Sequence, residues 1–296
     1  MKTRTLGNST LNISEISLGC MSLPPIETDV KPIIDAAIDA GITYFDTADL
    51  YDRGENEKVV GQALKEHRHN ILLATKVGNR WEDGKDGWGW DTSARYINEA
   101  VRSSLQRLQT DYLDVYQLHG GTTEDNWEEI IDTFEGLKKE GLIREYGISS
   151  IRPNVFIPFL QTSAAISNMM QFNILDERAE EYFEPIQASG ASVVTRGTVA
   201  KGLLTNDWRK RLKSFMSYDE AQAKELLEKI EALYGDVHAA ALAFNLHYET
   251  VASTVIGART KQQLLQNLAA YDKAQTLSDI GQLTNFTRQD RYTSHR

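Results

Sequence analysis

Four polar residues in the first 119 positions have the types and the spacing that proton-transfer chemistry needs. They are Asp46, Tyr51, Lys76 and His119. Three of them each end a short β-rich run, and Tyr51 follows Asp46 by five residues, in the loop after the run. The carboxyl-terminal ends of neighbouring parallel strands meet at one face of a barrel, where barrel enzymes place their active sites. We therefore expect the four side chains to converge.

Together the four residues have the properties of a proton-delivery site. A tyrosine with an ordinary pKa of ~10 is a poor acid near neutral pH. A lysine ammonium beside the phenol lowers the pKa of the tyrosine, and a carboxylate opposite the lysine keeps the ammonium charged and oriented. A histidine can hydrogen-bond the substrate oxygen or share the proton. We predict that Tyr51 protonates a substrate oxygen with the help of the other three.

Each of these residues also has a structural interpretation when it is taken alone. Asp46 would be a helix cap or turn residue, Tyr51 an ordinary loop aromatic, Lys76 a surface cation and His119 a satisfied buried histidine. A chemical alternative for Lys76 is the Schiff-base lysine of an aldolase, because a desolvated amine attacks carbonyl groups. That role needs a lowered lysine pKa, which a neighbouring Asp46 would oppose. Convergence at matching strand ends favours the proton-delivery site.

The elements that must position these residues alternate between β-rich runs and helical segments from about residue 15 to about residue 270. This order is typical of βα units around a parallel sheet. Ile97, Val101 and Leu105 illustrate the helical spacing of apolar residues. We predict a single (β/α)8 TIM barrel of the α/β class, not a doubly wound sheet. The eight candidate strands are 15–18, 43–46, 71–75, 113–118, 144–148, 166–171, 192–195 and 254–257.

Two segments flank the predicted barrel. Residues 4–6 and 11–13 surround Gly7-Asn8, which predicts an N-terminal β-hairpin, within residues 1–14, that closes the bottom of the barrel. From Tyr271 to residue 296 the sequence is expected to form an irregular polar C-terminal extension. The whole of 1–296 is interpreted as one domain.

Composition narrows the class of partner. The chain has 296 residues, 41% hydrophobic and 25% charged, which suffices for a large core. A formal net charge of −10 disfavours nucleic acid, whose phosphates need a broad basic surface. A single cysteine, Cys20, suits a reducing compartment. Because no apolar run resembles a signal peptide or approaches the ~20 residues that span a bilayer, we expect a cytoplasmic protein with no membrane partner. We assign no metal site, and the oligomeric state is not predicted.

The segment 79–92 follows the third predicted strand and holds Trp81, Trp88 and Trp90 among glycines. A loop in this position should rise from the catalytic face. Large aromatic surfaces are typical of the walls of small-molecule pockets, so we predict that the three tryptophans contact substrate. The alternative interpretation is a packed surface flap that binds no ligand.

The sequence resembles the aldo-keto reductase family from Arg4 to about Asn267. The resemblance is carried by the segments 41–51 (GITYFDTADLY), 73–76 (LATK), 111–119 (DYLDVYQLH), 146–149 (YGIS) and 171–173 (QFN). It implies that Asp46, Tyr51, Lys76 and His119 form the catalytic tetrad. It also implies that Tyr51 is the general acid for a carbonyl that receives hydride from the nicotinamide C4, so the partner would be a small-molecule carbonyl compound.

The cofactor can be argued from the residues as well. Thr260 and Gln263 fit a capping box at the start of the last barrel helix, and the free N–H groups of a helix start favour an anion. Arg259 beside them suits a phosphate monoester, which predicts NADPH rather than NADH. The alternative is a capping motif next to a solvated arginine. The resemblance further implies that Asn267 reads the adenine.

In the resemblance, the Ser149 region and Gln171 hold the carboxamide, and the loop 196–202 covers the pyrophosphate. This chain departs from many members at three positions: asparagine is common at the position of Ser150, a tyrosine that stacks on the nicotinamide at Arg196, and proline at Ile256. Arg196 would stack on the nicotinamide through its planar guanidinium. The predicted cofactor contacts are Gly19, Cys20, Met21, Asp46, Ser149, Ser150, Gln171, Arg196, Gly197, Thr198, Val199, Lys201, Gly202, Ile256, Gly257, Arg259, Thr260, Gln263 and Asn267.

A function without catalysis is the main competitor to a reductase. A barrel of this type could bind NADPH and report the redox state to a partner protein. The complete tetrad argues against this interpretation, and the sequence shows no coiled-coil heptad that would mark a partner surface. The physiological substrate is not predicted.

Overall fold

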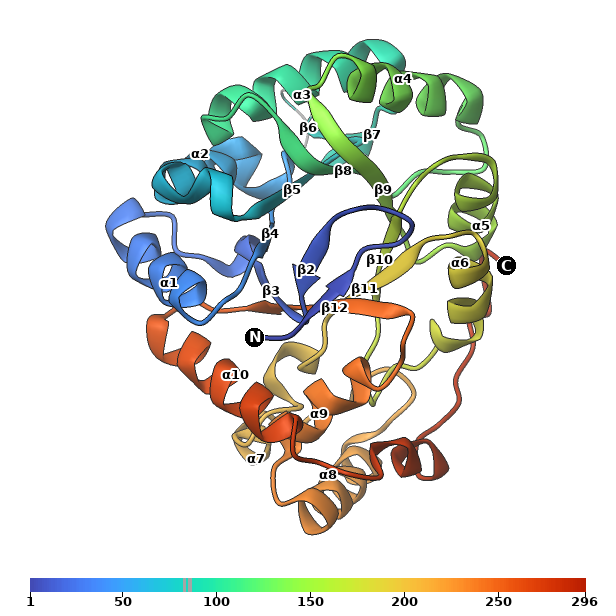
Figure 1. The fold of residues 1–296 in the computed structure, drawn as a ribbon. Helices are drawn as coiled ribbons and strands as arrows, with labels where there is room; N and C mark the ends of the chain where they lie inside the picture. The colour runs from blue at the N-terminus through green and yellow to red at the C-terminus, as the bar shows by residue number, and fades with distance from the viewer. Residues whose placement is uncertain (82–83, 85–86) are drawn as a thin grey trace.

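Eight parallel strands form a closed barrel in the structure, a computed structural model that describes residues 1–81, 84 and 87–296. Helices surround the barrel (Figure 1). This confirms the predicted (β/α)8 TIM barrel, with strand ends within three residues of the predicted ones. The strands, in barrel order, are β3 (Ile16–Gly19), β4 (Tyr44–Asp46), β5 (Leu72–Val77), β8 (Leu113–His119), β9 (Ile143–Ser149), β10 (Ser167–Gln171), β11 (Ser192–Arg196) and β12 (Val251–Gly257).

The helices form where apolar residues repeat with helical spacing and a polar residue caps the start. In α3 (Ala94–Leu108), Ile97, Val101 and Leu105 are buried, and the Ser93 hydroxyl accepts a hydrogen bond from the Tyr96 amide. The other helices are α1 (Glu27–Asp39), α2 (Glu55–Leu64), α4 (Trp127–Lys139), α5 (Pro153–Thr162), α6 (Phe183–Ala188), α7 (Trp208–Arg211), α8 (Glu220–Tyr234), α9 (Val237–Leu246) and α10 (Lys261–Ala274). Short 3-10 turns lie at η1 (Cys20–Ser22), η2 (Tyr51–Gly54), η3 (Lys65–Asn70), η4 (Glu180–Tyr182), η5 (Ala200–Gly202) and η6 (Ile280–Asn285).

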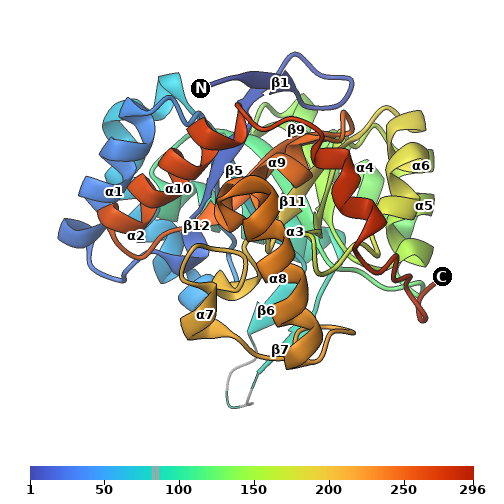
Figure 2. The ribbon, with the colours of Figure 1, turned by 90° about the horizontal axis from the view of Figure 1, so that it is seen from below.

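The N-terminal hairpin closes one end of the barrel, as the sequence predicts. Strands β1 (Thr3–Thr5) and β2 (Asn12–Ser14) pair antiparallel, and the hairpin buries Leu6, Leu11 and Ile13 against the inward-facing residues of the barrel. Figure 2 shows this hairpin at one end of the molecule and the strands β6 (Asn79–Trp81) and β7 (Trp88–Trp90) at the other. The hairpin therefore covers the amino-terminal ends of the barrel strands, and their carboxyl-terminal ends lie on the opposite side of the barrel.

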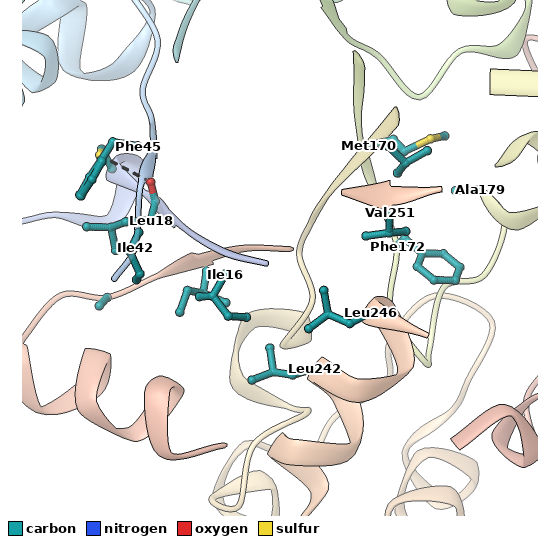
Figure 3. Packing of buried hydrophobic residues seen from close by; sticks show 14 of the residues in the cluster. Ile16, Leu18, Ile42, Phe45, Met170, Phe172, Ala179, Leu242, Leu246 and Val251 are labelled. Carbon is teal, nitrogen blue, oxygen red and sulfur yellow. Dashed lines mark hydrogen bonds between the residues drawn. The ribbon is translucent and has the colours of Figure 1, made fainter. Parts of the chain in front are cut away.

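Most of the core lies between the barrel and its helices. Figure 3 shows Leu18 and Phe45 packing together on one side, and Phe172 and Leu246 on the other. Phe172 also stacks on Phe244 of α9, with the ring centres 5.4 Å apart. This packing holds the strands against their helices and fixes where each strand ends.

The strand register aligns the chemical residues at one rim. Gly19 pairs with Asp46, and His119 pairs with Ser149. Gln171 pairs with Arg196 in the same way. Parallel strands in this register bring their last residues together at the carboxyl-terminal mouth of the barrel.

Two segments differ from the sequence-based expectation. The predicted loop 79–92 forms the antiparallel pair of β6 and β7, and its residues 82–83 and 85–86 lie outside the described residues. The tail is less irregular than predicted, because α10 continues to Ala274 and η6 buries Ile280 and Leu283. In the part of the chain that the structure describes, no helix combines the length and the apolar character needed to cross a bilayer.

Candidate active site

The ammonium of Lys76 is the centre of the cluster at the barrel mouth. Its Nζ donates to Asp46 Oδ2 at 2.6 Å, to the Thr47 carbonyl oxygen at 2.7 Å and to the Tyr51 hydroxyl at 3.3 Å. The Lys76 side chain is only 1% exposed. Three acceptors satisfy the three N–H donors of an ammonium, so the group is held in one position.

Asp46 has a second donor that sequence reasoning missed. Gln117 Nε2 donates to Asp46 Oδ1 at 3.1 Å, so each carboxylate oxygen has its own partner. A signal was present in the sequence, because Gln117 lies two residues before His119 in a strand and side chains two apart face the same way. The carboxylate is therefore held in place as firmly as the ammonium.

A sharp turn presents Tyr51 to this pair. Asp52, Arg53 and Gly54 all have positive φ, at 48°, 55° and 87°, which reverses the chain directly after Tyr51. Trp81 supports the turn, because its Nε1 donates to the Leu50 carbonyl oxygen at 2.9 Å and the Arg53 guanidinium lies 4.5 Å from its ring centre. Trp81 thus packs under the tyrosine loop.

His119 completes the cluster. Its ring lies edge-on to Tyr51, with the centres 6.2 Å apart. Burial lowers the pKa of His119 to about 3, and the charges of Lys76 and Arg196 add to the effect. The Nδ1 atom is buried and has no hydrogen-bond partner among the described residues. At neutral pH the imidazole is uncharged, so one of its nitrogens carries a proton and the other accepts.

The neutral state of His119 leads to a prediction about acid stability. A histidine whose pKa is depressed by folding contributes stability above its unfolded pKa, and this contribution is lost as the pH falls toward the folded value. His119→Asn cannot take up the proton. The variant should therefore lose less stability than the wild type between pH 6.5 and about 3. Urea unfolding over a pH series measures this. His69→Asn, the same substitution at an exposed histidine, serves as the matched control.

The pKa of Lys76 bears on the choice of chemistry. Burial by itself lowers the pKa of this lysine, but the charges of Asp46 and Tyr51 outweigh it, and the net pKa lies above the usual value. A Schiff-base lysine must lose its proton to attack a carbonyl. The geometry therefore opposes the aldolase alternative and keeps Lys76 as a cation.

Several predicted cofactor residues lie at the carboxyl ends of barrel strands, as Gly19, Ser149 and Gln171 do, whereas two others have side chains in the hydrophobic core. Cys20 and Ile256 are buried in the core, and burial raises the pKa of the Cys20 thiol well above its usual range. Met21, by contrast, is 63% exposed.

The loop after β11 turns sharply. Gly197, Ala200, Lys201 and Gly202 all have positive φ, between 46° and 91°. The amides of Ala200 and Gly202 donate within the loop, to the carbonyl oxygens of Gly197 and Val199 at 2.9 and 2.7 Å. Lys201 is exposed beside them.

The start of α10 is capped nearly as predicted. Thr260 Oγ1 accepts from the Gln263 amide at 3.2 Å, but the Gln263 side chain accepts from the Arg259 amide at 2.8 Å and not from Thr260. Asn267 Nδ2 donates to the Gly257 carbonyl oxygen at 3.3 Å, and the Arg259 side chain is exposed. The Arg259 guanidinium therefore lies next to a helix N-terminus and forms no ion pair with the residues that the structure describes.

Trp88 and Trp90 lie on the outer part of the mouth. Trp88 is 47% exposed and Trp90 is 41% exposed, with the ring centres 5.9 Å apart. Arg152 lies 4.5 Å from the Trp90 ring centre, and the same ring packs against Gly120, which directly follows His119. Trp88 and Trp90 are both exposed, whereas Trp81 is partly buried. Among the described residues no group of three or more metal-binding side chains is placed to hold an ion.

A closed α/β barrel whose polar cluster lies at the carboxyl ends of its strands is the architecture of a barrel enzyme. A model of the Aldo/keto reductase family matches residues 15–287. The chain therefore belongs to the aldo/keto reductase family and is an oxidoreductase. Members of this family generally bind NAD(P)H and act on small-molecule carbonyl compounds.

Similar proteins cover the chain from end to end. An uncharacterized oxidoreductase of Bacillus subtilis (strain 168), YqkF, is 47% identical over 305 residues, which is 100% of both chains. The holo form of the aldo-keto reductase AKR11C1 from Bacillus halodurans has a TM-score of 0.93 and 46% identity, covering 100% of this chain and 99% of the other. Its apo form has a TM-score of 0.87 and 42% identity over the same shares. The structure therefore superposes better on the holo form than on the apo form.

Proposed function

We propose that the protein reduces an aldehyde or ketone to an alcohol with NADPH and that Tyr51 donates the proton. The observation that carries the proposal is the single ammonium of Lys76, which bonds to both the Asp46 carboxylate and the Tyr51 hydroxyl. A buried cation in this position can stabilise a negative charge on the Tyr51 oxygen, which explains why Lys76 and Asp46 are buried together at the barrel mouth. The small-molecule carbonyl is the substrate class that this site suits.

The residues at the mouth fit a nicotinamide dinucleotide. Gln171 and Ser149, at the ends of β10 and β9, would hold the carboxamide, and the positive-φ loop 197–202 would hold the pyrophosphate. The exposed Arg259 would take the 2′-phosphate at the start of α10, where free N–H groups favour an anion. Arg196, at the end of β11, would flank the ring in place of an aromatic residue. When bound, the cofactor supplies the hydride.

The protein side chains handle the proton. As the carbonyl carbon gains hydride, its oxygen becomes an alkoxide and takes the proton of the Tyr51 hydroxyl, which leaves a phenolate. The ammonium of Lys76, 3.3 Å from that oxygen, stabilises the phenolate, and Asp46 keeps the ammonium oriented. The neutral His119 would donate a hydrogen bond to the substrate oxygen and so select its orientation.

Steady-state oxidation of NADPH in the presence of a panel of aldehydes and diketones tests the proposal. Turnover with a stoichiometric alcohol product supports a reductase. NADPH binding without turnover on any carbonyl in the panel would instead favour the redox-sensing alternative. Borohydride trapping adds a check on the aldolase alternative, because it should leave no covalent adduct on Lys76.

Cofactor choice gives a second prediction. Arg259→Ala should weaken NADPH binding by about one to two decades and leave NADH binding nearly unchanged, since the guanidinium is proposed to face only the 2′-phosphate. Fluorescence titration of both cofactors measures this. The exposed arginine of α3, as Arg95→Ala, is the control and should change neither affinity. An equal loss for both cofactors would remove Arg259 from the phosphate site.

The tryptophans are expected to act in two different ways. Trp88→Ala and Trp90→Ala should change the ranking of aromatic against small aliphatic carbonyls, because these exposed rings can line the substrate pocket. Trp81→Ala should instead lower turnover for all substrates alike, since Trp81 supports the Leu50–Tyr51 turn. Measuring kcat/KM for a matched pair of substrates separates the two effects. If Trp88 and Trp90 leave the ranking as in the wild type, the hairpin is scaffold.

A further inference from the structure

The amide of Gln171 is held in one orientation by a buried carboxylate. Its Nε2 donates to Asp176 Oδ2 at 2.6 Å. Because a carboxylate only accepts hydrogen bonds, the NH₂ end of the amide faces Asp176 and the Oε1 end faces away from it. Gly197 lies against the same side chain, since a Cβ on Gly197 would lie 3.3 Å from Gln171 Cγ. The Oε1 atom is thus presented as an acceptor at the end of β10.

Asp176 is held in turn by a bidentate arginine. Arg178 donates from Nε to Asp176 Oδ1 at 2.7 Å and from Nη2 to Oδ2 at 2.9 Å. The Asp176 side chain is 1% exposed, so its orientation depends on these donors. Fork-shaped pairs of this kind fix direction as well as distance.

The C-terminal tail supplies the surface on which this arginine rests. The Arg178 guanidinium lies 4.8 Å from the ring centre of Tyr292, which is 5% exposed and also contacts Tyr182. The tail is bound on both sides of Tyr292. Before it, the Arg288 amide donates to the Tyr218 hydroxyl at 2.7 Å, and after it the His295 carbonyl oxygen accepts from the Asn154 amide at 2.9 Å.

These contacts bring a distant part of the chain to the barrel mouth. In Figure 1 the C-terminus lies beside α5 and α6. Figure 2 shows the tail running from α10 along the outside of the barrel, away from the N-terminal hairpin. Tyr292, Arg178, Asp176 and Gln171 then form a continuous series of contacts that ends at the rim where β10 and β11 finish.

We propose that Tyr292 is a positioning residue for the nicotinamide end of the cofactor site. The ring covers the Arg178 guanidinium, limits the access of water to the Arg178–Asp176 pair and so preserves the geometry of the pair. Asp176 in turn keeps the Gln171 oxygen facing the carboxamide. The inference rests on the proposed function, because it assigns Gln171 to the carboxamide of NADPH. It gives the C-terminal tail a role at the nicotinamide half of the cofactor and none at the adenosine half.

The test compares two ligands that share the adenosine half. NADPH carries the nicotinamide, whereas adenosine 2′,5′-bisphosphate does not. Tyr292→Leu should weaken NADPH binding by roughly 2- to 30-fold, the range of a cation–π contact, and leave binding of the bisphosphate unchanged. Tyr292→Phe should rescue NADPH affinity, since the ring face is kept. Phe286→Leu is the matched control. It removes another aromatic ring of the tail that contacts a cation, since Lys229 Nζ lies 3.3 Å from the Phe286 ring centre, but this contact is not part of the series that leads to Gln171.

A double-mutant cycle makes the assignment specific. In a Gln171→Ala background, Tyr292→Leu should cause no further loss of NADPH affinity, because the group that it positions is absent. A full additional loss in that background, an equal loss for both ligands, or no loss in Tyr292→Leu alone each overturns the proposal. A wild-type chain that binds neither NADPH nor the bisphosphate defeats the proposed function itself, and the inference fails with it.

Discussion

Tyr51→Phe is expected to lower the rate of carbonyl reduction by about 10²–10⁴-fold while NADPH affinity stays nearly constant. Only the hydroxyl that accepts the hydrogen bond from Lys76 Nζ is removed, and the contacts proposed for the carboxamide, the pyrophosphate and the 2′-phosphate lie at or after the ends of β9 to β12. Single-turnover oxidation of bound NADPH with an unactivated aldehyde measures the chemical step. Fluorescence titration measures cofactor affinity on the same preparation.

A nearby phenol provides the control for this variant. The Tyr96 hydroxyl lies 3.5 Å from Asp49 Oδ2 and makes no contact with Lys76 among the bonds of the described residues. Tyr96→Phe should therefore keep wild-type turnover. If Tyr51→Phe also keeps near wild-type turnover, another group is the acid, and the role of Lys76 has to be reassigned.

The meeting of the four polar residues was predictable because a parallel barrel leaves little freedom. Once Asp46, Lys76 and His119 are placed at the ends of neighbouring strands, the fold brings them to one rim. Gln117 was missed, although the period of two along β8 puts it on the same face as His119. A strand-end residue should therefore be considered together with the residue two positions before it.

Contacts that depend on loops and on the tail were not predictable in the same way. The side chain of Cys20 is buried in the core, and residue type and sequence position alone do not reveal this orientation. Trp81 and Trp90 lie close together in the sequence, which suggests one common role. In the folded chain, however, the Trp81 indole N–H donates to the Leu50 carbonyl oxygen and so supports the Tyr51 turn. Tyr292 lies in a segment without apolar periodicity, and its contact with Arg178 exists only in the folded chain.

Lys76→Met is expected to abolish most of the activity and to lower the free energy of unfolding by about 3–5 kcal/mol. The substitution leaves the Asp46 carboxylate, which is 4% exposed, with Gln117 as its remaining side-chain donor. A buried charge without its counter-ion is far less stable than the pair. Urea unfolding at neutral pH gives the loss of stability, and NADPH oxidation gives the loss of turnover.

The double variant Lys76→Met with Asp46→Leu separates the two roles of the ion pair. Replacing both charges by apolar groups of similar size should recover most of the stability, because the desolvated carboxylate is gone as well. Activity should stay as low as in Lys76→Met, since Tyr51 still lacks the ammonium. Recovery of turnover in the double variant would contradict the role assigned to Lys76.

The single variant also has an expected pH dependence. Burial raises the pKa of Asp46 above its usual value already in the wild type, although the charge of Lys76 acts to lower it. Removing the ammonium takes away this lowering effect, so in the variant protonation of Asp46 favours the folded state even more. Relative to the double variant, which shares every other titrating group, Lys76→Met should be most stable at acidic pH and should lose stability as the pH rises through the folded pKa of Asp46. Lys76→Met with Asp46→Leu lacks the titrating group and should show no such fall. Urea unfolding of both variants over the same pH series measures the difference, and parallel curves would show that the carboxylate is not the source of the instability.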